Sequence, residues 1–217
     1  MDINNHNKLN YKVKIIDNFL EENDYKSLCS LNIEKNIKTG VKIYHNKIDE
    51  KKILVSCIDN DLLHKIHKKY HQIAKNILNE ISPEKLRLYD YSDFSITVIS
   101  KNSKFPIHDD TPDKLLSGVI YLYPIENLGT IFYNNKKGAD KTHIKWKSNR
   151  AVFFSRKERE TWHSYQGDEK NNRVVLVYNL MTNRIKEVFK IEKKNHFVGN
   201  LRYKLNPYLF KYFKKTI

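Results

Sequence analysis

Residues 86–182 constrain the fold most, because this part of the sequence alternates between short strand-like runs and turn-like clusters. β-Branched and aromatic residues dominate the runs, and Asn, Lys, Ser and Gly dominate the clusters. The runs lie at 94–99, 118–123, 130–133, 142–146, 151–154 and 173–180. Many short strands separated in this way predict a sandwich or a barrel. The chain is therefore expected to be mainly β.

The residues before this zone are expected to support it with one strand and two helices. The pattern predicts a strand at 11–16, a helix at 21–31 and a longer helix at 61–81. The longer helix carries one apolar stripe, formed by Leu62, Ile66, Tyr70, Ile73 and Ile77. A residue at 59–61 can cap its start, and Pro83 closes it.

The C-terminal part of the chain is basic and aromatic. Residues 201–213 are expected to form a short amphipathic helix or an extension that packs on the β-rich core. A chain of 217 residues suits one domain. We expect a single domain over 1–217, with supporting elements in 1–85, the core in 86–182 and an extension in 183–217.

The formal net charge of +15 favours a polyanionic partner such as nucleic acid. The excess is mostly lysine, however, and it is spread along the whole chain. Arginine, which is suited to bidentate contacts with bases and phosphates, occurs only seven times. Nucleic acid is therefore an open but disfavoured partner, and an anionic substrate or surface is a further alternative.

Other features of the composition bear on location and redox state. No stretch approaches the about 20 apolar residues of a spanning helix, so no membrane partner is expected. The first ten residues are polar and lack the apolar core of a signal peptide, which predicts a cytoplasmic location. Cys29 and Cys57 belong to no CxxC pair and are expected to be buried free thiols.

One segment of the β-rich zone carries two potential metal ligands. Residues two apart on an extended strand point the same way, so His108 and Asp110 can both face inward while Asp109 points elsewhere. A third ligand must come from a distant strand, and His163 is the best candidate. Two histidines and one carboxylate form the facial triad typical of non-haem Fe(II) oxygenases, which leaves three metal positions open.

Arg173 opens the longest apolar run, ten residues after His163. The intervening residues 167–172 predict a hairpin turn that would return Arg173 to the barrel near His163. An inward-facing arginine at this place needs an anionic partner, because an unpaired buried charge is very costly. A dicarboxylate co-substrate could supply that partner through a bidentate pair.

The motif His108-x-Asp110, followed after about fifty residues by His163 and ten residues later by Arg173, resembles the 2-oxoglutarate/Fe(II)-dependent dioxygenases. The surrounding sequence looks most like their prolyl-4-hydroxylase branch. The resemblance covers about 92–180. The ordered set of motifs within a strand-rich region is much more specific than the HxD motif alone.

Two further segments carry the resemblance, and two positions depart from it. Residues 118–123 resemble the strand that follows the HxD motif in this branch, and 128–132 resemble its GGxxxF strand. Val98 stands where the branch often has a tyrosine, and Leu128 replaces the first glycine of the GG pair. These departures concern the prolyl assignment and leave the three potential metal ligands intact.

The resemblance implies a double-stranded β-helix core, a jelly-roll and cupin-like architecture, with helices packed on one face. It implies that His108, Asp110 and His163 are catalytic residues that bind Fe(II). It also implies that Arg173, assisted by Tyr121, holds 2-oxoglutarate in the barrel mouth. The implied reaction uses O2 to hydroxylate a C–H bond and converts 2-oxoglutarate to succinate and CO2.

Nearby polar residues have alternative interpretations. Asp109 could replace Asp110 as the ligand, although strand alternation disfavours it. Three histidines lie at helical spacing and could bind a second metal, but a solvated polar face is the simpler interpretation: His64, His67 and His71. Four cations flank the segment that bears His163 and form either a solvated rim or a surface that steers an anionic substrate: Arg156, Lys157, Arg159 and Lys170.

Two other classes of function remain alternatives. The first is a non-catalytic β-barrel module that binds nucleic acid or another polyanion. The second is a cupin-like metalloenzyme that uses no keto acid, in which Arg173 would need another explanation. The primary substrate has no legible signature, because specificity in such folds comes from the loops. A prolyl residue of a protein is the first expectation by resemblance, and an anionic small molecule is the other.

Overall fold

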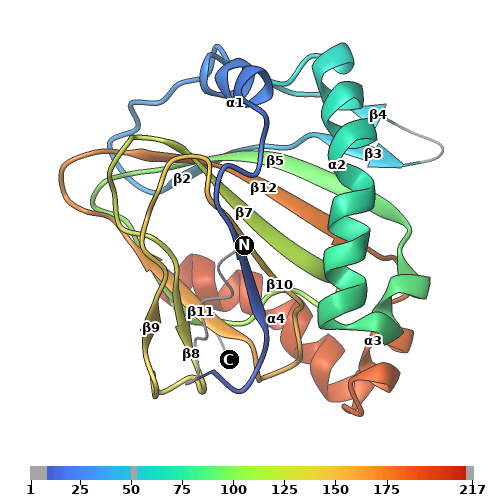
Figure 1. The fold of residues 1–217 in the computed structure, drawn as a ribbon. Coiled ribbons are helices and arrows are strands. Elements are labelled where there is room, and N and C mark those ends of the chain that lie inside the picture. Colours follow the sequence, from blue (N-terminus) through green and yellow to red (C-terminus); the bar gives the residue numbers. More distant parts are fainter. Residues whose placement is uncertain (1–8, 50–52, 214–217) are drawn as a thin grey trace.

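The computed structural model describes residues 9–49 and 53–213, which form two antiparallel sheets with helices packed around them (Figure 1). The strands are β1 (Val13–Ile16), β2 (Val41–Tyr44), β3 (Lys47–Asp49), β4 (Ile53–Leu54), β5 (Tyr91–Ile99), β6 (Lys104–His108), β7 (Lys114–Tyr123), β8 (Ile131–Tyr133), β9 (Thr142–His143), β10 (Ala151–Phe154), β11 (Trp162–Gln166) and β12 (Arg173–Met181). The helices are α1 (Glu22–Cys29), α2 (Asn60–Ile81), the 3-10 helix η1 (Pro83–Leu88), α3 (Ile185–Ile191) and α4 (His196–Phe213).

Strand pairing defines a large and a small sheet. The large sheet has the order β1-β10-β7-β12-β5-β3-β4, with β2 also paired to β5, and the small sheet has the order β6-β11-β8-β9. Neighbours in each sheet are mostly distant in the sequence, as β10, β7 and β12 are. This is the jelly-roll arrangement that the resemblance implied.

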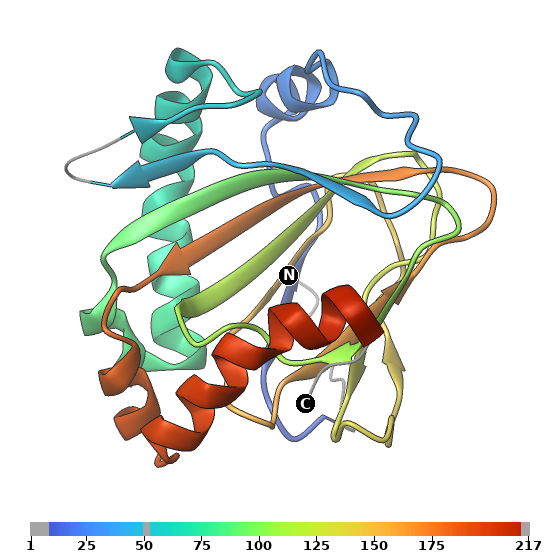
Figure 2. The ribbon, with the colours of Figure 1, turned by 180° about the vertical axis from the view of Figure 1, so that it is seen from behind.

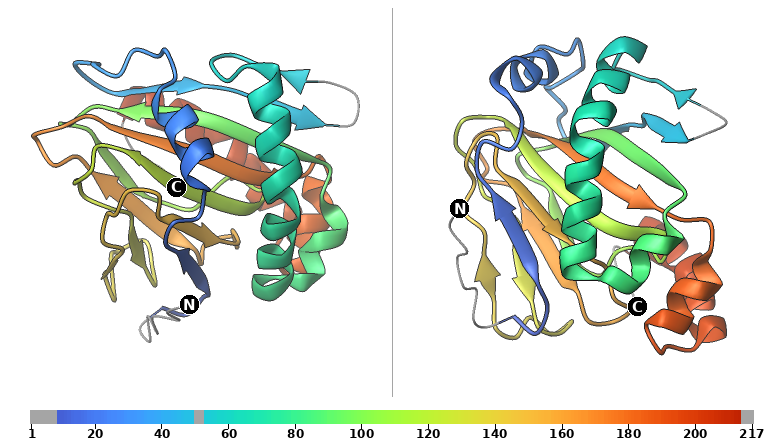
Figure 3. Two further views of the ribbon diagram at one scale, coloured as in Figure 1. Left: turned by 45° about the horizontal axis from the view of Figure 1, so that its top comes forward. Right: turned by 45° about the vertical axis from the view of Figure 1, so that its right-hand side comes forward.

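The two faces of the large sheet have different neighbours, because successive side chains of a strand point to opposite faces. On β12, Leu176 and Tyr178 belong to the core beneath α2, which crosses one face of the sheet (Figure 3). Val175 faces the other way and belongs to a second core, together with Phe132 of the small sheet. Arg173 is two residues before Val175, so it also points between the two sheets.

The long helix α2 begins one residue before its predicted start and ends at its predicted end. Its N-cap is Asp59, whose side chain accepts a hydrogen bond of 2.9 Å from the backbone N–H of Leu62. The backbone enters η1 at Pro83, directly after the C-cap residue Ser82. The start and end signals in the sequence were therefore sufficient to place this helix.

The predicted apolar stripe of α2 is partly wrong. Ile73 is 41% exposed and Leu62 is only half-buried, whereas Leu63, Ala74 and Leu78 are fully buried. The buried face is thus rotated from the predicted one. Hydropathy alone cannot choose between adjacent apolar stripes, and Ala74 gives only a weak signal although its small side chain suits a close contact.

His67 and His71 contradict the expectation of a solvated histidine face. Their rings stack at 4.4 Å, His67 packs against Phe94 and His71 packs against Tyr89. Burial lowers the pKa of His67, and it lowers that of His71 to about 4. The two rings are half-buried neutral packing groups, and they belong to no metal-binding group among the described residues.

Three short strands occur where the sequence predicted none. β2, β3 and β4 lie between α1 and α2 and extend the large sheet at β5. Their apolar residues are exposed in part, as Val41 and Ile43 are, so the usual buried alternation is missing. Conversely, the predicted strand 142–146 is only Thr142–His143, because Trp146 leaves the ladder and donates its indole N–H to Pro124.

Asp24 joins α1 to α2 through a cluster of donors. Its carboxylate is fully buried and lies 2.7 Å from Lys65 Nζ, 2.9 Å from Lys69 Nζ and 2.7 Å from Tyr70 Oη. Burial alone would raise the pKa of Asp24, but these hydrogen bonds outweigh it and hold the pKa at about 2. The ionised carboxylate therefore stabilises the contact between the two helices.

We predict that Asp24→Asn lowers the free energy of unfolding at pH 7 by about 1.5–3 kcal/mol, the contribution of a charge-assisted hydrogen bond. A depressed pKa gives stability that is present above the ordinary pKa of 3.8 and lost as the pH falls through about 2. The difference in the free energy of unfolding between variant and wild type should therefore disappear as the pH falls over that range. Urea unfolding at several pH values tests this, and a gap that persists at pH 2 would contradict it.

The two cysteines are free, as expected, but they are half-buried rather than fully buried. Burial raises the pKa of both thiols, Cys29 and Cys57. A raised pKa keeps a cysteine in its unreactive protonated form. Both residues are therefore packing groups.

α4 lies on the side of the large sheet away from α2, as comparison of Figures 1 and 2 shows, whereas α3 packs beside η1 and adds Val188 to the core beneath α2. α4 is longer than the predicted helix and begins at His196 rather than Leu201. Among the described helices, none combines the length and apolar character that a bilayer crossing requires.

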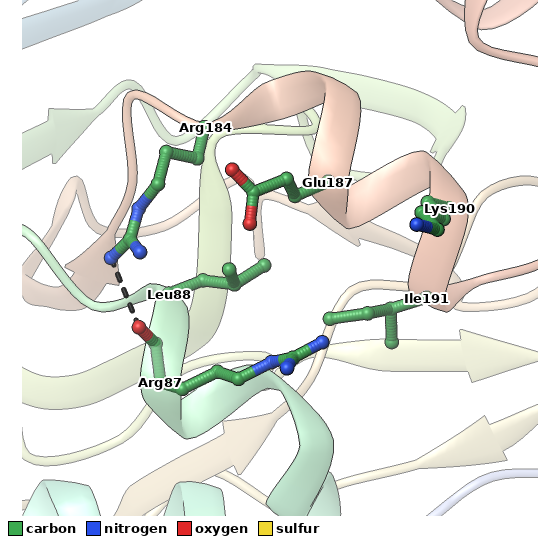
Figure 4. Close-up of a pocket in the computed structure, with 6 residues that line it drawn as sticks. All are labelled: Arg87, Leu88, Arg184, Glu187, Lys190 and Ile191. Atoms are coloured by element: carbon green, nitrogen blue, oxygen red, sulfur yellow. Dashed lines mark hydrogen bonds between the residues drawn. The ribbon is translucent and has the colours of Figure 1, made fainter.

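An open cavity of about 670 Å³ lies between η1 and α3 (Figure 4). Arg184 crosses it and donates hydrogen bonds to the carbonyl of Arg87 and to Asp90. Glu187 and Lys190 complete its charged lining. Because its lining carries both charges and Arg184 is already hydrogen-bonded, we interpret the cavity as a contact region between η1 and α3. None of its lining residues belongs to the predicted site.

Candidate metal centre

The structure brings the three predicted metal ligands together. His108 ends β6, Asp110 follows in the next loop, and His163 lies on β11. β6 and β11 pair so that His163 stands opposite His108, and the two ring centroids are 4.2 Å apart. One potential ligand atom from each of the three residues lies within 4.8 Å of the others. Strand pairing therefore closes the gap of about fifty residues between the two histidines.

Both histidines direct one ring nitrogen toward the backbone. His108 Nδ1 is 3.0 Å from the carbonyl of Pro106, and His163 Nδ1 is 3.4 Å from the carbonyl of Thr161. A carbonyl can only accept, so Nδ1 carries the proton and the Nε2 lone pair stays available for a metal. Burial lowers the pKa of His163 and lowers that of His108 to about 3, which keeps both rings neutral.

Asp110 is held by two donors that the sequence analysis did not single out. Lys114 Nζ lies 2.7 Å from one carboxylate oxygen, and Ser117 Oγ lies 2.5 Å from the other. Burial by itself would raise the pKa of Asp110, but the charge of Lys114 and its hydrogen bond hold it well below its usual range. A pattern search could have found Lys114, because it lies four residues after Asp110.

Asp109 turns away from this cluster, as strand alternation predicted. Its carboxylate accepts hydrogen bonds from the backbone N–H of Arg159 at 2.8 Å and from Arg202 at 2.5 Å. Asp109 therefore anchors the loop, and the alternative in which it replaces Asp110 as a ligand is not supported by the geometry.

The residues present fit a divalent transition metal. Two neutral imidazoles and one carboxylate supply two nitrogen donors and one oxygen donor, which suits Fe(II) and leaves further positions for exogenous ligands. The carboxylate and the metal also offset each other's charge in a buried place. Lys114 competes for the same carboxylate and, with Ser117, would orient it toward a bound ion.

Arg173 is a buried cation without a carboxylate partner in the described part of the chain. It is 3% exposed and donates one hydrogen bond of 3.0 Å to the carbonyl of Leu128, while its Nε has no hydrogen-bond partner. The guanidinium carbon lies 4.3 Å from the centroid of the Tyr165 ring. Because a buried unpaired charge is costly, this arrangement favours an exogenous anion at Arg173.

Tyr121 lies on β7 beside β12, where its register partner is Val175. Its hydroxyl donates to Thr130 Oγ1 at 3.0 Å and accepts from the backbone N–H of Thr130 at 2.9 Å. Its ring stacks on Trp146 at 4.3 Å. Tyr121 and Thr130 therefore form a fixed polar pair between the sheets, and the role of Tyr121 toward a co-substrate remains a prediction.

The segment 167–172 is not the hairpin turn that the sequence predicted. β11 belongs to the small sheet and β12 to the large sheet, so the segment crosses from one sheet to the other. Backbone hydrogen bonds from Gly167 to Ser103 and from Glu169 to Lys101 fix this crossing. Arg173 and His163 therefore lie on different sheets rather than on a shared ladder, and the Arg173 guanidinium contacts Tyr165, two residues along β11 from His163.

A buried charge network lies behind the metal-binding loop. Arg156, expected at a solvated rim, is fully buried. It forms an ion pair with Glu158 and a second one with Glu192, whose Oε2 lies 2.6 Å from Arg156 Nη1. Glu192 also accepts from the buried Lys85 at 2.7 Å. Arg156 donates at 3.2 Å to the backbone carbonyl of Asp110. The network thus connects η1 and α3 to the loop that carries a predicted metal ligand.

Arg202 of α4 extends this network to the C-terminal helix. Its Nη2 lies 2.5 Å from Asp109 Oδ2, and its Nε lies 2.8 Å from Glu158 Oε1. We predict that Arg202→Met lowers the free energy of unfolding by about 3–5 kcal/mol, because it leaves the buried carboxylate of Asp109 without a cation. Lys194→Met is the control, since its partner Glu160 is 41% exposed and such pairs contribute about 1 kcal/mol or less. Equal losses in urea unfolding would contradict the prediction.

The known proteins that resemble this chain are recognised by their structures and not by their sequences. No family model and no curated protein matches the sequence. A prolyl-4-hydroxylase from Pseudomonas putida is 14% identical with a TM-score of 0.54, over 80% of this chain and 94% of that one. A 2OG-Fe(II) oxygenase family oxidoreductase from Burkholderia pseudomallei is 13% identical with a TM-score of 0.56, over 78% and 84%.

The chain has the fold of the 2OG-Fe(II) oxygenases. A third structure with this oxygenase fold is a prolyl hydroxylase from Trichoplax adhaerens in complex with a hypoxia inducible factor oxygen degradation domain peptide fragment. It is 15% identical with a TM-score of 0.53, over 84% of this chain and 90% of that one. The predicted double-stranded β-helix core is confirmed. At these identities the likeness concerns the fold, and the roles of the site residues stay predictions.

Proposed function

We propose that this chain is an Fe(II)- and 2-oxoglutarate-dependent oxygenase that hydroxylates a C–H bond. The overall reaction would consume O2, 2-oxoglutarate and a substrate R–H, and it would release succinate, CO2 and R–OH. The oxygenase fold supports this proposal, and so does the grouping of His108, Asp110 and His163.

One observation carries the proposal: a metal-binding triad and a buried cation without a carboxylate share the interior between the two sheets. The triad alone would suit many metal sites. Arg173 alone could be a packing residue. Their combination suits a ligand with a metal-chelating keto acid at one end and a free carboxylate at the other, which 2-oxoglutarate provides.

The residues have distinct tasks in this reaction. His108 and His163 would bind Fe(II) as neutral imidazoles, and Asp110 would bind it as an anion oriented by Lys114 and Ser117. Arg173 would hold the far carboxylate of 2-oxoglutarate. Fe(II), when bound, supplies the redox chemistry by which O2 oxidises the keto acid and the substrate. The burial of Asp110 strengthens its electrostatic contacts with Lys114 and with a bound cation.

The first substrate class to test is a prolyl side chain of a polypeptide. Two of the proteins with similar structures are prolyl hydroxylases. Val98 and Leu128 depart from the pattern of that branch, so anionic small molecules belong in the same panel. Succinate formed above the background without substrate identifies the productive class.

The decisive experiment adds Fe(II) and 2-oxoglutarate to the metal-free protein without oxygen and records the visible spectrum. Chelation of Fe(II) by a keto acid gives a weak charge-transfer band, and we expect a band that requires both components. If the folded protein gives no band and forms no succinate in air, the proposal is wrong. Salt-dependent DNA binding without iron uptake would then support the polyanion-binding alternative.

A further inference from the structure

The outer face of α4 is an apolar stripe that nothing in the described chain covers. Its members are between 42% and 77% exposed: Phe197, Val198, Leu201, Leu205, Tyr208 and Tyr212. With 3.6 residues per turn, these positions fall within about 100° of one another around the helix. Large apolar side chains grouped on one exposed face usually mark an interaction site.

The opposite face of α4 is fixed to the protein. Arg202 pairs with Asp109 and Glu158, and Gly199 lies so close to Phe189 that an added Cβ would overlap its ring. The helix therefore cannot turn its stripe inward without breaking a buried charge network. Figure 2 shows α4 on the outside of the molecule.

The charges that α4 itself carries are all positive. The α4 sequence contains no acidic residue, and Lys204 and Lys211 are exposed beside the stripe. The whole chain carries a net charge of +15. An occupant of this face must therefore be apolar at its centre and anionic around it.

We propose that α4 docks the protein on an anionic lipid membrane, with the stripe in the interface and the lysines against the headgroups. An interfacial helix combines an apolar face of aromatic and aliphatic residues with flanking lysines. Tyr208 and Tyr212 suit such a boundary, because tyrosine has an apolar ring and a polar hydroxyl. The sequence analysis expected no membrane partner because no segment could span a bilayer, but an interfacial helix need not span one.

Two other occupants fit the stripe less well. A second copy would bring two chains of +15 together and would place Lys204 and Lys211 near their counterparts. A peptide that binds in a groove would need one beside α4, and the cavity between η1 and α3 is lined by no residue of α4. A membrane needs only an exposed convex stripe and a negative surface.

The test is flotation of the full chain with vesicles of phosphatidylcholine alone and of phosphatidylcholine mixed with phosphatidylserine. We expect binding to the mixed vesicles, weaker binding at high salt and little binding to neutral vesicles. The variant Phe197→Ser/Tyr208→Ser should reduce partitioning at least tenfold, because both side chains leave the apolar stripe. Both are largely exposed, so the thermal unfolding temperature should be unchanged.

The matched control is Ile125→Ser, which removes an apolar side chain that is 81% exposed outside α4 and should leave vesicle binding unchanged. If the wild-type protein binds neither kind of vesicle, the proposal is wrong. It is also wrong if the double variant still binds like wild type, since the lysines alone would then suffice. Light scattering that shows a dimer lost in the double variant, without vesicle binding, would assign the stripe to a second copy instead.

Discussion

Arg173→Met is expected to raise the apparent KM for 2-oxoglutarate about a hundredfold or more while leaving the fold intact. A charge-assisted hydrogen bond contributes about 1.5–3 kcal/mol, and a guanidinium can make two to one carboxylate. Each 1.4 kcal/mol corresponds to about a factor of ten. The rate of succinate formation as a function of 2-oxoglutarate concentration measures this effect.

The stability of the same variant separates a ligand-binding role from a packing role. Arg173 is buried with one hydrogen bond to Leu128 and an orphan Nε, so methionine should leave the ligand-free protein at least as stable as wild type. Excess 2-oxoglutarate with Mn²⁺ should raise the unfolding temperature of wild type but not of the variant. Arg173→Lys keeps the charge and loses the planar fork, so its KM should lie between the two.

Two outcomes would contradict this interpretation of Arg173. An unchanged KM would show that the co-substrate carboxylate binds elsewhere. A large loss of stability in Arg173→Met would show that the guanidinium holds the sheets together through Leu128 and Tyr165, as a packing residue would.

The sequence could indicate that His108 and Asp110 share one side of the chain because this information is local. His108 and Asp110 are two residues apart on one extended segment, so strand alternation decides which side chains face inward. None of the predicted strand-like runs contains His163, which was expected only to lie on a distant strand. The pairing of β6 with β11 is a tertiary fact, and the family resemblance implied only that the two histidines share one metal.

The features that sequence reasoning missed are set by tertiary burial. Arg156 is a charged residue in a charged segment, so the sequence indicated a solvated rim. It is buried nonetheless, because it forms ion pairs with Glu158 and Glu192. β2 lacks buried alternation, since Val41 and Ile43 are both exposed, and β3 and β4 are too short to show a pattern. The crossing at 167–172 looked like a hairpin because turn residues do not reveal which sheet the next strand will join.

The network behind the metal centre explains why α4 is part of the domain rather than a loose extension. Arg202 binds Asp109, and Asp109 lies between the two predicted ligands of the HxD segment. No sequence pattern indicated this contact, since about ninety residues separate the pair. A basic C-terminal residue thus stabilises the loop that carries Asp110.

His163→Ala should abolish iron-dependent succinate formation, because it removes one of three donors from the site. Loss of an outer-shell contact typically lowers metal affinity about 10–100-fold, and loss of a direct ligand should exceed that. Metal affinity can be followed with Mn²⁺ by calorimetry, independently of turnover. The metal-free variant should unfold cooperatively at a temperature close to that of wild type, because His163 is a neutral ring with one long backbone hydrogen bond.

His143→Ala is the matched control for this variant. His143 is exposed on β9 of the same small sheet and belongs to no metal-binding group among the described residues, so its loss should leave metal affinity and activity unchanged. If His163→Ala binds Mn²⁺ as tightly as wild type, the triad is not the metal site. If it loses the metal but still forms succinate at the wild-type rate, turnover occurs without this centre and the proposed function is wrong.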